Sequence, residues 1–389
     1  MKKIICVILS LALSTLIFAQ DLSQQVKEAC MPYVQNVTGT GFTVVWTTNM
    51  DAVSWVEVAP DDGTDFQNVE RQKYYDLSGL GRRPVTKLHR VTVSGLKPDT
   101  KYRYRVMMEG VIQENNRKGI IYTAGYGLDV AKYPTYVRTL AQSYDKLKIA
   151  VVNDVHENDS VFRRLFKDSK DKYDFVVFNG DMTSTIDNEK DLVANYLNSA
   201  ASLFACSTPF YMVRGNHEYR GNDALKFKDY FATPTGKTYY TFSYGKYFFL
   251  VLDGGEDKCD SDIRNLGVMI TEQYVKEESE WLKTVIASED FKKAETRIAF
   301  CHMPPEPKGW HGNVMVDKYL VPTLNEGGID LMLCAHIHAY RYDKVGTTDA
   351  KFPIVCNPNR QLMTVDVDGK SISLNIVNPD GKLTHSIKF

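Results

Sequence analysis

Five of the eight histidines in this chain lie in four short phrases that also carry carboxylate or amide side chains. These phrases are DVH (154–156), GNHE (215–218), FCH (300–302) and AHIH (335–338), and a fifth phrase, NGD (179–181), adds one more carboxylate. A cluster of Asp, Asn and His can hold two divalent cations side by side, and such a pair performs hydrolytic chemistry on phosphate esters. The residue types therefore predict a two-metal hydrolytic site.

Each of these phrases follows a short apolar run, namely IAVVN, DFVVF, FYMV, RIAF and DLMLC in chain order. Such runs are typical of buried strands, and helical patterns lie between and after them at about 161–168, 187–204, 224–230 and 272–288. Alternating strands and helices favour a sheet with helices on its faces and with ligands at the carboxyl ends of its strands. We therefore expect the five phrases to meet along one sheet edge.

Residues 27–140 carry a different pattern, with alternating strand-like segments separated by turn residues, which predicts an all-β domain. The segment GLKPDTKYRYRV resembles the turn between the fifth and sixth strands of fibronectin type III domains, where Tyr102 would be the corner tyrosine. Trp46 is then expected in the core, and His89 is expected to be structural. The stretch 113–145 is less regular and would close this domain and link it to the next.

The 389 residues allow two domains, and the composition, with 43% hydrophobic residues, is ordinary for a globular protein. Residues 1–20 are typical of a secretory signal peptide, with an apolar stretch too short for a stable membrane span. An N-terminal membrane anchor is the alternative. Without these residues the formal net charge is about −3, which gives no reason to expect a nucleic-acid partner. The signal indicates an exported protein, in the bacterial periplasm or outside the cell.

The ordered series DxH, GD, GNH(E), a lone His and GHxH identifies residues 147–345 as similar to the calcineurin-like metallophosphoesterases. The N-terminal β-domain, with its WTT and LKPDTKYRYRV phrases, resembles the domain that precedes the catalytic unit of purple acid phosphatases. The resemblance implies two domains after the signal: a β-sandwich at 27–140 and an α/β metallophosphoesterase domain at 147–389. In the second domain, central β-sheets would be flanked by helices in a four-layer αββα arrangement.

The family's ligand pattern can be transferred to matching positions of this chain. It implies that one metal is held by Asp154, His156 and His338, and the other by Asn216, His302 and His336, with Asp181 bridging both. It also implies that a metal-bridging hydroxide attacks phosphorus, while His217 does not bind metal but faces the leaving oxygen and protonates it. The nitrogen and oxygen donors suit two divalent ions such as Mn, Zn, Fe(II) or Co.

Three positions depart from the family patterns. Purple acid phosphatases have a tyrosine that binds ferric iron where this chain has Ser184, and they usually have Gly where it has His156, so we do not expect a purple ferric enzyme. Ser184 also replaces the Asp that orients the catalytic His in serine/threonine phosphatases, which leaves the partner of His217 open. Ala335 replaces the first Gly of GHxH and should be tolerated unless its φ is positive.

Four further residues lie close to these motifs. Arg214 either contacts the substrate phosphate or forms an ion pair with Glu218, and the sequence favours neither. His311, beside Trp310, either lines the substrate entrance or is an exposed loop histidine. Cys301 and Cys334 flank metal ligands within apolar runs, where a small buried hydrophobe is the better interpretation.

The first functional hypothesis is an exported phosphomonoesterase, similar to acid phosphatases, that acts on small organic phosphate esters. A phosphodiesterase or nucleotidase with the same site is the alternative, because the ester is selected by loops whose shape the sequence does not give. A third hypothesis is a β-sandwich binding protein whose metal site is inert. The complete ligand set argues against it, because an enzyme that had lost its activity would be expected to have lost at least one ligand. The sequence leaves the oligomeric state open.

Overall fold

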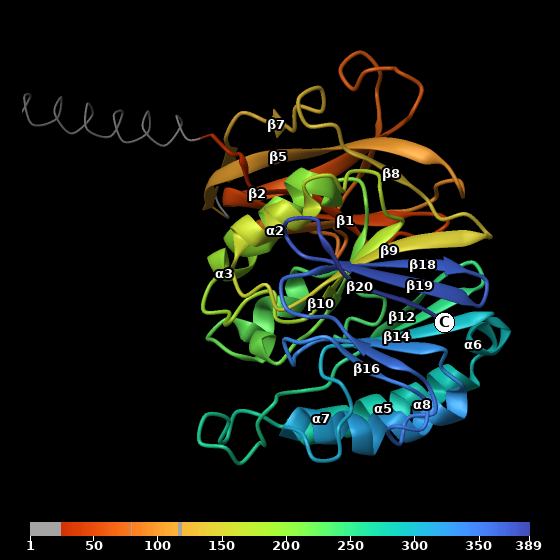
Figure 1. The fold of residues 1–389 in the computed structure, drawn as a ribbon. Helices are drawn as coiled ribbons and strands as arrows, with labels where there is room; N and C mark the ends of the chain where they lie inside the picture. Colours follow the sequence, from red (N-terminus) through yellow and green to blue (C-terminus); the bar gives the residue numbers. More distant parts are fainter. Residues whose placement is uncertain (1–24, 79, 116–118) are drawn as a thin grey trace, which may run out of the picture.

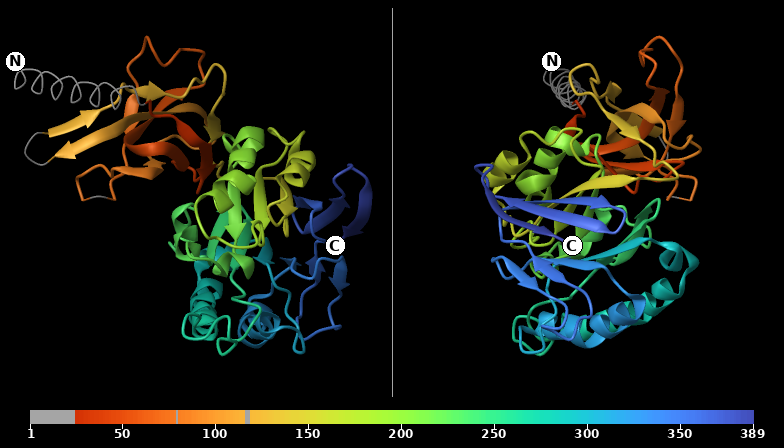
Figure 2. Two further views of the ribbon diagram at one scale, coloured as in Figure 1. Left: turned by 90° about the vertical axis from the view of Figure 1, so that its left-hand side faces the viewer. Right: turned by 45° about the vertical axis from the view of Figure 1, so that its right-hand side comes forward.

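The computed structural model describes residues 25–78, 80–115 and 119–389, so the signal peptide predicted at residues 1–20 lies outside the described residues. A strand-rich N-terminal part lies above two stacked sheets, and helices cover the far face of the lower sheet (Figure 1). Figure 2 shows from two further directions that the strand-rich part and the helices α5–α8 lie at opposite ends of the molecule. None of the described helices is both long enough and apolar enough to cross a membrane.

The N-terminal part is one sheet system of eight described strands, organised around the long strand β2. The first half of β2 pairs with β1 and β4, and its second half pairs with β3 and β5. The strands are β1 (Glu28–Gln35), β2 (Phe42–Pro60), β3 (Gln72–Tyr74), β4 (Thr86–Val93), β5 (Lys101–Asn115), β6 (Gly119–Tyr122), β7 (Tyr126–Gly127) and β8 (Tyr136–Arg138).

The core of this part confirms three sequence predictions. Trp46 is fully buried, and His89 stacks on its ring at a centroid distance of 5.0 Å. The two ring nitrogens of His89 lie 3.0 and 2.9 Å from the hydroxyls of Thr48 and Ser54, and burial lowers the pKa of His89 to about 3. His89 is therefore a structural residue. The hydroxyl of Tyr102 accepts a hydrogen bond from the backbone N–H of Lys97 at 3.0 Å, as expected of a corner tyrosine.

The second part contains two six-stranded sheets. The first has the order β11-β10-β9-β18-β19-β20 and the second the order β12-β13-β14-β15-β17-β16. The strands of the first are β9 (Lys146–Val152), β10 (Phe175–Asn179), β11 (Phe210–Val213), β18 (Leu362–Asp368), β19 (Ser371–Val377) and β20 (Leu383–Lys388). Those of the second are β12 (Tyr240–Tyr244), β13 (Tyr247–Leu252), β14 (Thr296–Cys301), β15 (Leu331–Cys334), β16 (Arg341–Asp343) and β17 (Ile354–Cys356).

Helical segments cover the outer faces of the two sheets, and several of them join into uninterrupted helical stretches at residues 190–205 and 311–327. On the first sheet they are α2 (Asp159–Phe166), α3 (Lys190–Leu192), η1 (Val193–Leu197), α4 (Asn198–Ala200) and η2 (Ala201–Ala205). On the second they are α5 (Thr271–Ala287), α6 (Glu289–Lys293), α7 (His311–Met315), η5 (Val316–Leu320) and α8 (Val321–Gly327). Two 3-10 turns, η3 (His217–Tyr219) and η4 (Ala224–Asp229), follow β11.

Three apolar cores hold these layers together. One lies between the two sheets and includes Phe175, Phe249 and Phe300. The other two lie between each sheet and its own helices, around Phe178 for the first sheet and Leu282 for the second. The order of layers is therefore helix, sheet, sheet, helix, which confirms the predicted αββα domain after a strand-rich N-terminal domain.

The parallel strands explain why the five sequence phrases lie close together. Strands β9, β10 and β11 are parallel neighbours in the first sheet, and β13, β14, β15 and β17 are parallel neighbours in the second. The carboxyl ends of parallel strands meet at one edge of a sheet, so the segments that follow them converge. Each of the five sequence phrases follows such an end, as the apolar runs predict.

The N-terminal part packs on the α/β part through β1. The ring of Tyr33 is fully buried and lies 5.5 Å from the ring of Phe210 in β11, measured between centroids. Its hydroxyl donates a hydrogen bond of 2.9 Å to the backbone carbonyl of Tyr230. Tyr104 makes a second link, because its hydroxyl donates to the carbonyl of Cys206 at 2.8 Å. The two parts therefore share buried contacts.

We expect Tyr33→Ala to lower the free energy of unfolding by about 3–5 kcal/mol, because it removes a buried aromatic ring. Tyr33→Phe should cost about 1–3 kcal/mol, since it leaves the carbonyl of Tyr230 without its donor. Denaturant unfolding of the purified protein measures both. The matched control is Tyr133→Phe at a ring that is 42% exposed, which should change the value by less than about 0.5 kcal/mol. Equal stability of the Tyr33→Ala and control variants would contradict this packing role.

Candidate metal centre

The predicted ligands come together at the shared sheet edge in groups with metal-ligand spacing. Asp154, His156 and His338 each offer one ligand atom within 4.8 Å of the other two. Asp181, His302 and His336 do the same. These groups match, apart from Asn216, the two ligand sets expected from the sequence.

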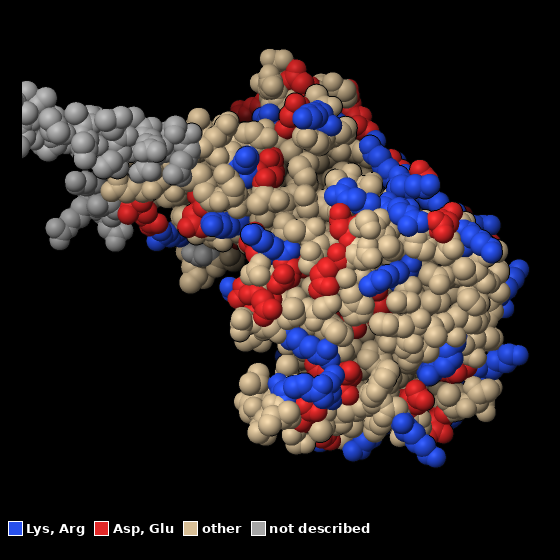
Figure 3. Space-filling model, turned by 60° about the vertical axis from the view of Figure 1, so that its left-hand side comes forward, with Lys and Arg blue, Asp and Glu red and all other residues tan. Residues whose placement is uncertain are grey.

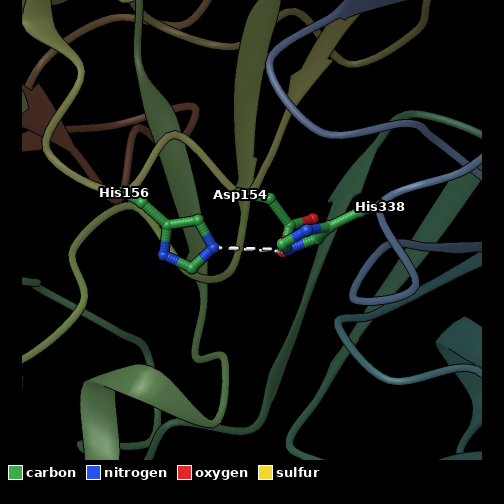
Figure 4. Close-up of side chains that lie close together, drawn as sticks. All are labelled: Asp154, His156 and His338. Atoms are coloured by element: carbon green, nitrogen blue, oxygen red, sulfur yellow. Dashed lines mark hydrogen bonds and ion pairs between the residues drawn. The ribbon is translucent and has the colours of Figure 1, made fainter.

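In the first group, two histidines converge on one carboxylate (Figure 4). The Nε2 atom of His338 lies 3.1 Å from Oδ1 of Asp154, and Nε2 of His156 lies 3.9 Å from the same oxygen. The two Nε2 atoms are 3.3 Å apart. Two imidazole nitrogens and a carboxylate oxygen at these distances present three donors to one small volume.

The second group is more deeply buried. The Nε2 atom of His302 lies 3.1 Å from Oδ2 of Asp181, and its Nδ1–H donates to the carbonyl of Asn179 at 2.8 Å. That hydrogen bond fixes the ring so that Nε2 faces the site. The ring of His336 lies beside that of His302, at a centroid distance of 5.2 Å. Asn216 is 1% exposed at the same edge.

The hydrogen-bond pattern shows that these residues suit bound cations. Buried polar atoms normally have partners, so several unpartnered ones at one place need an explanation. Among the described residues, four candidate ligand atoms are buried and make no hydrogen bond, although Asp154 and His302 have ion-pair contacts of 3.1 Å: Oδ1 of Asp154, Oδ1 of Asn216, Nε2 of His302 and Nε2 of His336. All four are electron-pair donors when the imidazoles are neutral, so divalent cations would satisfy them.

Asp181 connects the two groups. Its Oδ2 lies 3.1 Å from Nε2 of His302 and 3.9 Å from Nε2 of His217. Asp181 also belongs to a third set of convergent ligand atoms, with His156 and His217. The carboxylate thus lies between the histidines of the first group and those of the second, as a bridging ligand requires.

A proton and a metal ion cannot occupy the same imidazole nitrogen, so the pKa values of the histidines in the two groups affect metal binding. Burial lowers the pKa of His302, but the charge of Asp181 outweighs it and raises the pKa to about 10. The Asp154 carboxylate, whose Oδ1 lies 3.1 Å from Nε2 of His338, raises the pKa of that histidine. Burial lowers the pKa of His156, and it lowers that of His336 to about 4. Each group therefore combines a histidine whose pKa is raised with one whose pKa is lowered.

The backbone of the ligands is unusual. Five of the seven have a positive φ: 49° at Asp154, 46° at His156, 53° at Asp181, 69° at His336 and 57° at His338. Asp, Asn and His adopt this left-handed conformation more readily than other non-glycine residues. Each strand can therefore stop abruptly and aim a ligand across the sheet edge.

Gly180 makes one of these turns possible. Its φ is 86°, and a Cβ there would lie 2.3 Å from Nδ1 of His302. The NGD phrase thus brings its backbone against the imidazole ring because the middle residue has no side chain. Ala335, by contrast, does not have a positive φ, so its replacement of a glycine is tolerated as expected.

Two hydrogen-bond clamps support the ligands, and the sequence reasoning missed both. The buried carboxylate of Glu218 accepts backbone N–H groups of Asp181, Met182 and Gly215 at 2.8–3.0 Å. The second clamp is the amide of Asn153, whose Nδ2 donates to Oδ2 of Asp154 at 2.7 Å, while Asn357 donates to Oδ1 of Asn153 at 2.7 Å. Asn357 follows β17, so its position after an apolar run was the available signal.

The structure supplies the partner of His217 that the sequence left open. Its Nδ1–H donates to the backbone carbonyl of Ser184 at 2.8 Å, so Nε2 faces Asp181 and the site. The hydroxyl of Ser184 donates to Oε2 of Glu157 at 2.7 Å. The residue that replaces the family's tyrosine or aspartate therefore orients His217 through its main chain.

Of the two alternatives for Arg214, the ion pair with Glu218 is wrong, and a contact with the substrate phosphate stays a prediction. The guanidinium of Arg214 instead pairs with Oδ2 of Asp253 at 2.8 Å and lies over the ring of Tyr219, 3.6 Å from its centroid. Glu218 is occupied by the backbone N–H groups. Arg220 is the guanidinium beside His217, with Nη1 at 3.3 Å from Nε2, and the sequence reasoning did not single it out.

The remaining candidates are found around this edge. The ring of Trp310 packs edge-on against that of His336 at a centroid distance of 4.7 Å and is 56% exposed. His311 begins α7 beside it, and its backbone N–H donates to the carbonyl of Asp257 at 3.1 Å. A contact between His311 and substrate stays a prediction. Cys301 and Cys334 are fully buried in the apolar core, which agrees with their interpretation as small hydrophobes.

The comparisons with known proteins agree with this arrangement. The calcineurin-like phosphoesterase family matches residues 147–340, and the purple acid phosphatase N-terminal domain matches residues 31–118. Purple acid phosphatase 21 of Arabidopsis thaliana is 23% identical over 265 residues, which are 65% of this chain and 53% of that protein. The chain thus spans about half the length of this relative.

Two solved structures share the fold. Purple acid phosphatase PPD1 from yellow lupin (Lupinus luteus) seeds superposes with a TM-score of 0.62 at 16% identity, over 92% of this chain and 73% of the other. The structure of PhoD gives a TM-score of 0.62 at 12% identity, over 92% and 89% of the two chains. With both domain matches and a ligand edge suited to two cations, this chain contains a domain of the calcineurin-like phosphoesterase family, preceded by a purple acid phosphatase N-terminal domain.

Proposed function

We propose that this protein is an exported phosphomonoesterase that releases inorganic phosphate from small organic phosphate esters. The observation that carries the proposal is the position of Asp181 between two ligand groups, with the imidazole of His217 beside it. A dinuclear centre of this kind serves phosphoryl transfer, and a free imidazole next to it can handle the leaving group.

In this proposal the seven ligands divide as the family pattern implies. One cation would be held by Asp154, His156 and His338, the other by Asn216, His302 and His336, and Asp181 would serve both. When bound, the pair of cations supplies a nucleophile at neutral pH and neutralises charge on the phosphoryl oxygens. Mn, Zn and Fe(II) all suit this nitrogen and oxygen donor set.

His217 acts on the leaving oxygen. Because Nδ1–H is held by the carbonyl of Ser184, the proton that can be transferred is the one on Nε2. The Nε2 atom lies 3.9 Å from Oδ2 of Asp181, on the open side of the site, since 27% of the His217 side chain is exposed. We propose that this proton passes to the ester oxygen as the bond to phosphorus breaks.

Export is the second element of the proposal, and it rests on the sequence of residues 1–20. Lys2 and Lys3 precede an apolar stretch, and FAQ follows it as the processing region. The periplasm or the exterior of a bacterial cell would be the location. The near-neutral charge of the remaining chain suits a small-molecule substrate better than a nucleic acid.

The decisive assay measures the initial rate of p-nitrophenolate release by residues 21–389 from p-nitrophenyl phosphate and from its bis-ester, with Mn, Zn or Fe(II). We expect faster cleavage of the monoester, because that substrate places one dianionic phosphoryl group on the metals. Asp181→Asn should lower kcat about a thousandfold, equivalent to about 4 kcal/mol of transition-state stabilisation.

A matched control for this assay is His385→Gln, at a ring that stacks on Tyr340 and belongs to none of the ligand groups. It should retain full activity. Preference for the bis-ester would move the protein to the phosphodiesterases. No turnover with any metal by a folded protein would favour an inert binding module.

For His217→Gln we expect a loss of kcat that depends on the leaving group. With p-nitrophenyl phosphate the loss should be small, because p-nitrophenolate departs without a proton. With an alkyl phosphate it should reach about 10²–10⁴-fold, the range of general acid catalysis. Steady-state kinetics over a series of leaving groups tests this, with metal content measured in each variant. An equal loss for all substrates would show that His217 does not protonate the leaving oxygen.

Metal binding should release protons, because His302 holds a proton below its pKa of about 10 in the metal-free protein. From pH 6 to 8, affinity for Zn²⁺ should therefore rise with pH, about tenfold per pH unit for each proton released. Titration calorimetry in buffers of different ionisation enthalpy counts these protons. His302→Ala should release about one proton fewer than the wild type. Affinity that does not depend on pH would contradict the assignment of His302 as a ligand.

A further inference from the structure

A cavity of about 400 Å³ lies next to the proposed site, between the turn after β11 and the loop after β13. Its lining includes Tyr219, Arg220, Lys258, Arg264, Asn265 and Val268. Three of its lining residues are basic and none is acidic. This volume is in the range of small-molecule sites. On the face drawn in Figure 3, Lys and Arg side chains gather beside Asp and Glu side chains around a hollow in the lower part of the molecule.

Arg220 lies both at the cavity and beside His217 of the proposed site. This guanidinium lines the cavity, and its Nη1 lies 3.3 Å from Nε2 and 3.4 Å from Nδ1 of His217. His217 is the residue that we propose to face the leaving oxygen. The cavity is therefore adjacent to the part of the substrate that departs.

The three basic side chains are held in place from behind by three carboxylates. Arg220 pairs with Glu256 at 2.7 Å and with Asp257 at 2.8 Å, and Lys258 pairs with Asp257. Arg264 pairs with Asp262 at 2.8 Å. The charges of these six groups balance, but the Glu256 carboxylate is fully buried.

Lys258 and Arg264 keep donors that their carboxylate partners do not use. The hydrogen bonds of Arg264 to Asp262 use Nε and Nη2, and a guanidinium has further N–H groups on Nη1. The ammonium of Lys258 has three donors and donates one hydrogen bond, to Asp257, within the described part of the chain. Fixed cations with spare donors are suited to a phosphate or carboxylate, because their orientation is already set by the acidic partners.

We infer that this cavity is a subsite for a second anionic group, a phosphate or a carboxylate, on the leaving portion of the substrate. Arg220, Lys258 and Arg264 donate to that group while the scissile phosphoryl group lies at the metal ligands. The apolar side chain of Val268 lines the same cavity and suits a short carbon linker between the two ends. This inference rests on the proposed function and adds its substrate class.

The test compares α,ω-alkanediol bisphosphates of two to eight carbons with the matching alkyl monophosphates, using the metal-loaded protein. At the best linker length we expect kcat/KM for the bisphosphate to exceed that for the monophosphate by about tenfold or more, the worth of hydrogen bonds to a charged group. Lys258→Gln combined with Arg264→Gln should reduce this preference to about twofold or less. Hydrolysis of the monophosphates should stay unchanged in the same variant.

The control is Lys283→Gln on α5, where the lysine pairs with Glu280 and is 53% exposed. It should keep the full preference for bisphosphates. Monophosphate hydrolysis with no preference at any linker length would overturn the subsite and leave the proposed function standing. A preference that persists in the Lys258 and Arg264 variant would also overturn it. If neither substrate type were hydrolysed with any metal, the proposed function and the subsite would both be rejected.

Discussion

The left-handed backbone at the strand ends is the constraint on which the site depends. Five of the seven proposed ligands have φ between 46° and 69°. For a non-glycine residue this conformation costs roughly 1–2 kcal/mol relative to the right-handed one. Asp and His accept it better than most residues, and they are also the residues that bind hard and borderline divalent cations. The same residue types thus tolerate the left-handed backbone of the turn and supply the donor atoms for a cation.

At Asp181 and Asp154 this conformation is held by buried side chains that hydrogen-bond to the turns. Glu218 gathers the N–H groups of the segments that contain Asp181 and Gly215, so the bridging carboxylate and the turn before Asn216 move as one unit. Asn153 and Asn357 do the same for Asp154 across β9 and β17. In the absence of cations, the pairing of Asp181 with His302 offsets part of the negative charge that these clamps bring together. The ligands are therefore pre-organised before any metal binds.

The fold and the ligand edge could be predicted because both depend on local patterns. Apolar runs specify strands, and a polar residue after each run marks the edge where parallel strands end. The α5 pattern, predicted at 272–288, is found at Thr271–Ala287 for the same reason. The N-terminal domain was recognisable from Tyr102 and its turn, since that hydrogen bond is local.

The contacts between segments distant in sequence could not be predicted in this way. Sequence proximity suggests Glu218 as the ion-pair partner of Arg214. The partner in the structure is Asp253, which follows β13 in the other sheet. The loop after β13 has no periodicity, so nothing in the sequence indicated that Asp257 would hold Arg220 beside His217. Side-chain pairing across two sheets depends on how the sheets stack, which a single strand does not encode.

The proposed metal ligands and the residues that would contact the leaving group lie on different parts of the fold. The proposed ligands for the cations lie at strand ends, whose positions follow from the hydrogen-bond register within each sheet. The groups around His217 and the neighbouring cavity come from η3 and the loop after β13, which lie outside those registers. Loops can change without disturbing the sheets that they connect, so a metal centre of constant geometry can serve different esters. With the inferred subsite, the choice of leaving group would depend on Arg220, Lys258 and Arg264 rather than on the proposed metal ligands.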